Sequence, residues 1–484
     1  MRRSASAGNT ALALALISML ALLTPAAGEL NVVAEHNLQI ARHVLEKGSG
    51  EVGAFYAACM DEAAVRRAGA APLQPLMSRI DAIRDRASLS AALADLDDAG
   101  VNALWVATAA VDAHGSPHYV AVVAPSENAG GYHLVARNDL AALTPQIDWN
   151  LYFERRGFPA FADLNVTDPA YLRSLGERLR ALPFARLRAE LRSRLLAAFS
   201  PWLPPDAGGR APPIPRWKRC VALVDSEMPD ELGRAWVARA FSPALKAKAE
   251  RMVARIIAAM RARIEAATWL SESARTEALA KLDGMTMAIG YPDRWPDFEE
   301  DVGIDDRSLI ADILAARAAR IVAEIAKVGA PVDRHGFGMS VLAANAYYAP
   351  LRNEIVVPAG LLQPPLFGGG DAADYGAAGA AIGHEISHAF DERGRYFDAD
   401  GELKDWWTPH DAAAFASRAA CIDAGSITRE EAVADRTGVE LAYDAFERTA
   451  QGPGARHRFY DAFRAMWAGT TRADDALSSR CSVW

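Results

Sequence analysis

The sequence predicts a mainly α-helical protein with small β elements, an α+β chain, and three observations support this. Apolar residues recur every four positions at Met252, Ile256, Met260 and Ile264, with arginines between them. This spacing is typical of an amphipathic helix that packs one face. Alanine, the best helix former, is abundant throughout the chain. Strand signals are few and short.

The first residues are typical of an export signal. Arg2 and Arg3 give a positive start, an apolar run covers Ala11–Leu23, and small residues suitable for cleavage follow up to Gly28. The apolar run is short for a membrane span, which needs about 20 apolar residues, although an uncleaved anchor is the alternative. No later segment resembles a transmembrane helix. We therefore expect residues 1–28 to be a signal peptide, with no stable membrane insertion after its removal.

A chain of 484 residues is too long for one ordinary core, so we expect at least two domains. Apolar recurrence also predicts helices within Leu172–Phe199 and Ser308–Val328, where the apolar stripes are expected to be core. The helical pattern stops at Pro201–Pro215, which is rich in proline and glycine and resembles a linker. A second change of pattern comes near Gly290.

Two strand predictions follow from short apolar runs. Val101–Val106 and Tyr119–Val123 flank a turn-rich stretch, which predicts a β-hairpin. Glu354–Val357 is expected to be a short strand that Pro358 ends.

Charge and cysteine usage narrow the function classes. The net charge of −9 argues against a general nucleic-acid-binding protein, which would have a basic surface. The four cysteines are widely spaced, without a Cys-x-x-Cys pair, which favours disulfides in an oxidising compartment over a thiolate metal site. Buried free thiols are the alternative, and four cysteines allow three pairings. These cysteines are Cys59, Cys220, Cys421 and Cys481.

The most informative motif is the His384-Glu385-Ile386-Ser387-His388 pentapeptide. An α-helix advances about 100° per residue, so residues four apart lie about 40° apart on one face. Both histidines can therefore bind one zinc ion, while Glu385 reaches a metal-bound water without ligating. The alternative is a helix with two core or surface histidines. The small and apolar residues around the motif favour the metal, because histidines buried there need polar partners.

A catalytic zinc needs a third protein ligand and an open position for water. Glu431 and Asp435 are four residues apart, hence on one helical face, and can act as a ligand and as a partner that orients a ligand histidine. Charged residues at this spacing are more often a solvated helix face, so the motif alone does not decide.

The sequence resembles the neprilysin family of zinc endopeptidases over roughly residues 50–484. The motifs that carry the resemblance are Phe55-Tyr56-Ala57-Ala58-Cys59, Arg216-Trp217-Lys218-Arg219-Cys220, Asn345-Ala346-Tyr347-Tyr348, Asn353 to Pro365, Gly383 to Asp391, Asp400-Gly401, Asp405-Trp406-Trp407 and Cys481-Ser482-Val483-Trp484. The similarity is most specific between residues 342 and 407.

The resemblance implies a two-lobed zincin-like metallopeptidase with a helical lid. It suggests a mainly helical lid domain at residues 29–285 and a catalytic domain at 286–484. It implies one Zn²⁺ per chain bound by His384, His388 and Glu431, with Glu385 as general base and acid and Asp435 holding a ligand imidazole. It further implies that Asn345 and Ala346 bind the peptide backbone on an edge strand. The implied disulfide pairs are Cys59 with Cys220 and Cys421 with Cys481.

The sequence departs from the family at three places. A segment that carries an oxyanion-stabilising histidine and a substrate-binding arginine is expected after the third ligand. We expect it to be deleted between Trp467 and Cys481, because the one histidine after Glu431 is His457, in a different stretch. The stretch from Cys421 to Glu431 is short, and the segment that starts the mature domain in the family has no counterpart. Losing an oxyanion donor typically costs about 10²–10³ in rate.

We therefore expect an exported, periplasmic or secreted zinc endopeptidase that hydrolyses short peptides. Zinc lowers the pKa of its water and polarises the scissile carbonyl, and Glu385 moves the proton to the leaving amine. The alternative is an attenuated or inactive peptidase-like protein that binds zinc or peptides. A purely structural zinc site is disfavoured, because such sites are normally closed by four protein ligands.

Overall fold

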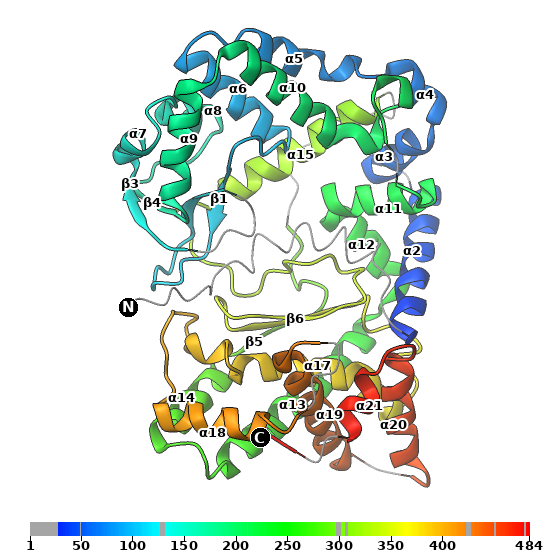
Figure 1. The fold of residues 1–484 in the computed structure, drawn as a ribbon. Coiled ribbons are helices and arrows are strands. Elements are labelled where there is room, and N and C mark those ends of the chain that lie inside the picture. Colours follow the sequence, from blue (N-terminus) through cyan, green and yellow to red (C-terminus); the bar gives the residue numbers. More distant parts are fainter. Residues whose placement is uncertain are drawn as a thin grey trace.

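The computed structural model describes residues 28–48, 50–125, 131–210, 212–296, 302–304, 308–422, 427–449, 452–478 and 481–484. The predicted export signal lies outside these ranges except for Gly28, which opens helix α2 (Gly28–Lys47). Helices dominate and two small sheets accompany them, which confirms the predicted mainly helical α+β class. Figure 1 shows an upper and a lower part, with α2 running between them at one side.

The upper part in Figure 1 combines helices with a four-stranded sheet in the order β1-β2-β4-β3. Its helices are α3 (Glu51–Met60), α4 (Glu62–Ala68), α5 (Gln74–Asp81), α6 (Arg86–Asp98), α7 (Leu140–Leu143), α8 (Trp149–Arg155), α9 (Pro169–Ala181), α10 (Phe184–Phe199), α11 (Arg216–Glu227) and α15 (Leu309–Ile325). Its strands are β1 (Val106–Ala110), β2 (Val120–Ala124), β3 (Leu134–Ala136) and β4 (Asp163–Val166).

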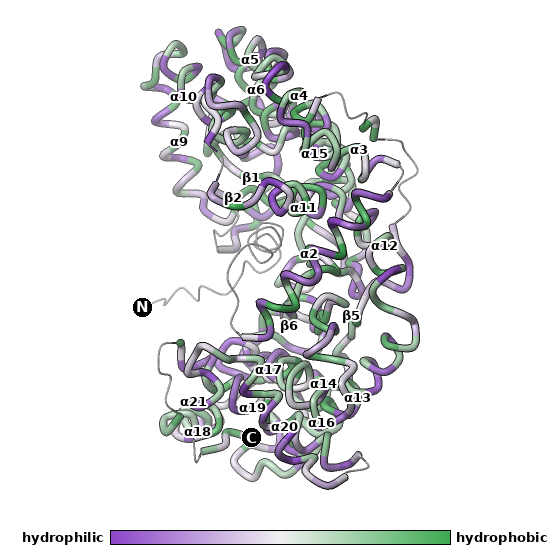
Figure 2. The backbone as a smooth tube through the Cα atoms, turned by 90° about the vertical axis from the view of Figure 1, so that its right-hand side faces the viewer, coloured by the Kyte–Doolittle hydropathy of each residue, from purple (hydrophilic) through white to green (hydrophobic). Residues whose placement is uncertain are grey.

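The lower part contains a three-stranded sheet in the order β5-β7-β6 and the C-terminal helices. Its strands are β5 (Thr286–Gly290), β6 (Tyr347–Ala349) and β7 (Glu354–Pro358). Its helices are α13 (Pro243–Ala266), α14 (Glu272–Asp283), α16 (Asp371–Asp374), α17 (Ala380–Ser387), α18 (Pro409–Ala419), α19 (Arg429–Glu447), α20 (Ala455–Met466) and α21 (Arg472–Ser478). Figure 2, turned by 90°, shows α2 and α12 (Pro229–Ala240) between the two parts.

Most predicted elements are confirmed, with two shifts. The stretch Leu172–Phe199 forms two helices, α9 and α10, because Pro183 disfavours helical backbone at the residue before it, and Leu182 is extended. The predicted hairpin exists as β1 and β2, paired antiparallel, but its first strand begins only at Val106. Trp105 lies instead in the core, with its ring centroid 4.7 Å from that of Trp149.

Both disulfides implied by the resemblance are present. Cys59 is bonded to Cys220 and joins α3 to α11, while Cys421 is bonded to Cys481 and ties the C-terminal residues to the chain beyond α18. Within the described ranges, no helix is both long enough and apolar enough to cross a membrane.

The two parts are interleaved along the chain. Helices α13 and α14 precede residue 286, yet α13 packs against α14, α17 and α19 in the lower part. Helix α15 follows residue 286, yet it packs against α3, α6, α11 and β1 in the upper part. The packing therefore does not divide the chain at a single boundary near residue 286. A lid domain at residues 29–285 and a catalytic domain at 286–484 remain a proposal.

Candidate zinc site

The two histidines lie where helix α17 meets helix α19. The backbones approach closely because glycines face each other: a Cβ on Gly383 would lie 2.6 Å from the Gly438 carbonyl oxygen, and one on Gly438 would lie 2.5 Å from the His384 amide. Any side chain at either position would push the helices apart. Glu431 and Asp435 on α19 are thereby brought opposite His384.

The three predicted ligands converge. The Nε2 atoms of His384 and His388 are 3.0 Å apart. Glu431 places one carboxylate oxygen 3.4 Å from Nε2 of His384 and the other 3.8 Å from Nε2 of His388. One ligand atom from each residue lies within 4.8 Å of the others. Two imidazole nitrogens and one carboxylate oxygen, with one side left open, are the donor set of a catalytic zinc site.

Each histidine is oriented by a carboxylate at its other ring nitrogen. Asp435 Oδ1 lies 2.9 Å from His384 Nδ1, and Asp391 Oδ2 lies 2.7 Å from His388 Nδ1. A carboxylate at Nδ1 favours the tautomer that leaves Nε2 free for a metal. Asp435 was predicted for this position. Asp391 was missed as an orienting residue, although its position three residues after His388 was a usable signal.

The electrostatics of the cluster favour a cation. Burial by itself lowers the pKa of His384, but the carboxylates of Asp435 and Glu431 outweigh it and raise the pKa to about 10. The hydrogen bond with His384 lowers the pKa of Glu431 to about 2. A site that stabilises positive charge on its own histidines also attracts a divalent metal ion. The residues present therefore fit zinc.

Glu385 lies beside the ligands and does not point away into the core. Its Oε2 accepts a hydrogen bond of 3.2 Å from the backbone N–H of Tyr348 on β6, and its Oε1 is 3.9 Å from His384 Nε2. Burial raises the pKa of the Glu385 carboxyl. A carboxylate with a raised pKa is suited to accept and return a proton near neutral pH.

A cavity of about 150 Å³ opens on His384, Glu431 and Glu385. Asn345 and Ala346 line it and directly precede β6, the edge strand of the lower sheet. Both residues were expected on the edge strand itself, but β6 begins at Tyr347, so they lie just before it. Apolar residues from distant segments complete the wall, namely Leu30, Leu361, Ala381 and Trp467. Leu30 on α2 was not predicted to reach the site.

The family's segment with a histidine and an arginine was expected to be missing between Trp467 and Cys481, yet one arginine of this interval reaches the site. Arg472, at the start of α21, lines the cavity. Its Nε and Nη2 atoms donate hydrogen bonds of 2.8 and 2.7 Å to the two oxygens of Asp435, and Nη2 lies 3.7 Å from Glu431 Oε2. Its guanidinium lies 3.9 Å from the Trp467 ring centroid. Among the described residues that line the cavity, His384 is the sole histidine, and His457 is exposed on α20.

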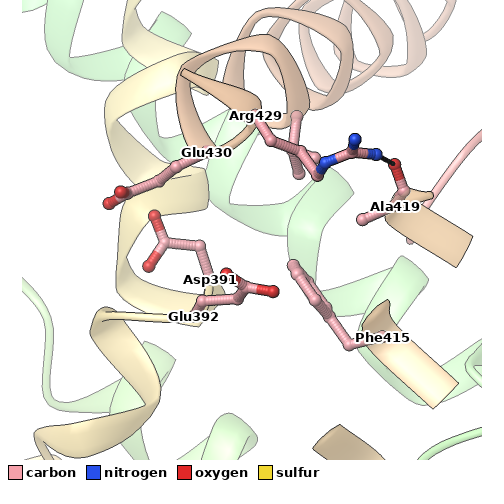
Figure 3. A pocket seen from close by; sticks show the side chains of 7 residues that line it. Asp391, Glu392, Phe415, Ala419, Arg429 and Glu430 are labelled. Carbon is pink, nitrogen blue, oxygen red and sulfur yellow. Dashed lines mark hydrogen bonds between the residues drawn. The ribbon is translucent and has the colours of Figure 1, made fainter. Parts of the chain in front are cut away.

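A second group of possible metal ligands adjoins the predicted zinc ligands and shares His388 with them. Ligand atoms of His388, Asp391 and Glu430 also lie within 4.8 Å of one another. Figure 3 shows the carboxylates of Asp391 and Glu430 near one another, while Arg429 is turned toward the Ala419 carbonyl, to which it donates a hydrogen bond of 3.0 Å. The cavity there measures about 10 Å³, room for about one water molecule. It is too small for a peptide.

Comparison with known proteins bears on this geometry. Sequence profiles described as Peptidase family M13 match residues 24–130 and 125–292 for its N-terminal part, and residues 345–468 for its peptidase part. The chain belongs to peptidase family M13. The resemblance to the neprilysin family is thereby confirmed, because the M13 relatives of this chain include neprilysin-11 of Caenorhabditis elegans, 27% identical over 70% of this chain and 46% of the relative.

Other M13 relatives agree. Endothelin-converting enzyme 1 of Rattus norvegicus is 28% identical over 67% of this chain and 47% of its own length. The chain thus spans about half the length of these curated relatives. Among solved structures, the zinc metalloprotease Zmp1 of Mycobacterium tuberculosis with an inhibitor has a TM-score of 0.80 at 26% identity, over 93% of this chain and 86% of that one.

The fold of this M13 chain is also that of a more distant protein. PepO of Lactobacillus rhamnosis has a TM-score of 0.76 at 20% identity, over 98% of this chain and 92% of that one. The two-lobed zincin-like fold expected from the resemblance is therefore confirmed.

Proposed function

We propose that this M13 chain is a zinc-dependent endopeptidase that hydrolyses short peptides. The observation that carries the proposal is the convergence of His384, His388 and Glu431 on one point, with Glu385 in the cavity that His384 and Glu431 also line. An open fourth side is what distinguishes a catalytic from a structural zinc site. The similarity in fold to Zmp1, a zinc metalloprotease, supports the same function.

The roles of the chain's own residues follow from their contacts. A zinc ion held by the three ligands would supply a Lewis acid for the scissile carbonyl. Glu385 accepts a proton from the attacking water and delivers it to the leaving amine. Asp435 and Asp391 hold the two imidazoles in orientation. The backbone at Asn345 and Ala346 extends an edge strand, which suits an extended peptide that adds to the sheet.

The wall of the cavity favours an apolar side chain next to the scissile bond. Leu30, Leu361, Ala381 and Trp467 face the space beside the ligands. Burial of an apolar side chain there is worth about 1.5–3 kcal/mol for a residue such as Leu or Phe before the costs of binding. We propose that peptides with such a residue are preferred.

Arg472 is proposed to bind a substrate carbonyl, in place of the segment that is lacking. We expect Arg472→Met to lower kcat/KM for peptide cleavage by about 10²–10³ while zinc content is retained, as for loss of a donor to a developing oxyanion. Kinetics on one peptide with metal analysis of the same samples would measure this. Arg436→Met is the matched control, because Arg436 also holds α21, through the Ala476 carbonyl, without lining the cavity. An equal loss in both variants would reduce Arg472 to a packing role.

Metal removal tests the proposed function as a whole. We expect a chelator to abolish cleavage of a library of short peptides, and one equivalent of Zn²⁺ per chain to restore it, since the described residues offer one open ligand set of this kind. Mass spectrometry of the products should show cleavage at internal bonds. Cleavage that survives complete zinc removal would contradict the proposal, as would zinc binding without cleavage of any peptide.

Export belongs to the same proposal. Residues 1–28 have the pattern of a signal peptide, and both disulfides fit an oxidising compartment such as the periplasm or the exterior. Peptides are the proposed partners, and the net charge of −9 argues against nucleic acid. The upper, mainly helical part is proposed to act as the lid that limits access to short peptides.

A further inference from the structure

Lys281 is a fully buried lysine near the site that the proposed mechanism does not use. It lies on α14 with 0% exposure, and its Nζ donates hydrogen bonds of 2.6 Å to the carbonyl oxygens of Gly394 and Phe397. Burial lowers the pKa of this amine to about 7, against the opposing effect of the Asp391 and Asp398 carboxylates. A methionine would fill the same space without desolvating a charge, so the two hydrogen bonds are what the lysine adds.

The two carbonyls belong to the turn that holds Asp391. Oδ1 of Asp391 accepts hydrogen bonds of 2.8 Å from the N–H groups of Arg393 and Gly394, while Oδ2 contacts His388. Gly394 therefore donates its N–H to Asp391 and offers its carbonyl to Lys281. A Cβ on Gly394 would lie 2.0 Å from the His388 carbonyl oxygen, so this turn folds tightly onto the end of the ligand helix. Displacement of the turn would move Asp391 and, with it, the imidazole of His388.

The backbone of Lys281 reaches the other side of the site. Its carbonyl accepts a hydrogen bond of 2.8 Å from Nδ2 of the buried Asn353, whose Oδ1 accepts one of 2.9 Å from the Tyr348 hydroxyl. The N–H of Tyr348 in turn donates to Glu385. Lys281 thus connects α14 both to β6, whose Tyr348 N–H contacts Glu385, and to the turn in which Asp391 orients His388.

We propose that Lys281 is a positioning residue of the zinc site, which acts by holding the 391–397 turn so that Asp391 orients His388. This inference rests on the proposed zinc site and adds a residue from outside the ligand helices. A core lysine without this role would stabilise the fold and leave the metal affinity unchanged.

The test is a double-mutant cycle on zinc affinity, with Zn²⁺ alone competing against a chromogenic chelator. We expect Lys281→Met and Asp391→Asn each to weaken zinc binding by about 10–100-fold, the usual cost of losing a partner of a ligand. If Lys281 acts through Asp391, the double variant should be much less impaired than the product of the two single effects. Multiplicative effects would overturn the proposal, as would a Lys281→Met affinity equal to that of the wild type.

Lys246→Met is the matched control, because Lys246 is another buried lysine that donates to a backbone carbonyl, that of Tyr291, away from the ligands. It should bind zinc as the wild type does. If Lys281→Met does not fold, Lys281→Gln, which keeps one donor, takes its place in the cycle. The affinity readout is independent of cleavage. A wild type that binds zinc and cuts no peptide would contradict the proposed function and still leave the Lys281 proposal decided by the cycle.

Discussion

Replacement of Glu385 by glutamine is expected to lower kcat/KM for peptide cleavage by about 10²–10⁴, the usual contribution of a positioned acid–base group, with zinc content unchanged. Glutamine has nearly the same shape, and its carbonyl oxygen can still accept the hydrogen bond from the Tyr348 N–H. It cannot accept a proton from water. Steady-state kinetics on one peptide, with metal analysis of each sample, would measure the effect.

Glu392→Gln is the control for Glu385→Gln. Glu392 is an exposed carboxylate close in sequence to the ligand helix. It lines the small neighbouring cavity and not the larger one. It should retain wild-type kinetics. If Glu385→Gln kept its activity, the proton would have to be accepted by another group, and the mechanism proposed for this chain would be wrong.

The second large effect is expected for Glu431→Gln, which should weaken zinc binding more than the roughly 10–100-fold cost of losing a partner outside the ligand set, and abolish cleavage at ordinary zinc concentrations. Glu431 supplies the one carboxylate among the three proposed ligands, with oxygens 3.4 and 3.8 Å from the two Nε2 atoms. Its removal leaves two neutral nitrogen donors and less negative charge for the cation. Competition with a chelator would measure the loss of zinc affinity, and a peptide assay would measure the loss of cleavage.

The adjacent Glu430→Gln variant shows which of the two groups of possible ligands binds the metal, the one with Glu431 or the one with Glu430. Glu430 lies on the same helix, forms an ion pair of 2.9 Å with Arg393, and shares the second group with His388 and Asp391. We expect it to bind zinc nearly as the wild type does. A larger zinc loss in Glu430→Gln than in Glu431→Gln would move the metal to the second group and contradict the assignment of Glu431.

Helical content and the ligand spacing could be predicted because both depend on local periodicity. The apolar spacing of four predicted α13, and the same spacing placed His384 and His388 on one face. Boundaries were less predictable, as Pro183 divides one predicted helix and Trp105 leaves the predicted strand for the core. In both cases a single residue, Pro183 or Trp105, overrides the periodicity that the residues around it predict.

The sequence by itself determined the helical class, the pentapeptide with two proposed ligands and the proposed base, and the Glu431–Asp435 pair on one helical face. Its motifs also carried the family resemblance and the cysteine pairing that this resemblance implies. Only the tertiary structure decided that α17 and α19 meet through Gly383 and Gly438, which brings that pair to the histidines. It alone revealed that Arg472 and Leu30 line the cavity, and that Lys281 donates a hydrogen bond to the turn after the ligand helix. The reason is physical: helix periodicity is set by nearby residues, whereas contacts between distant segments depend on how the helices pack.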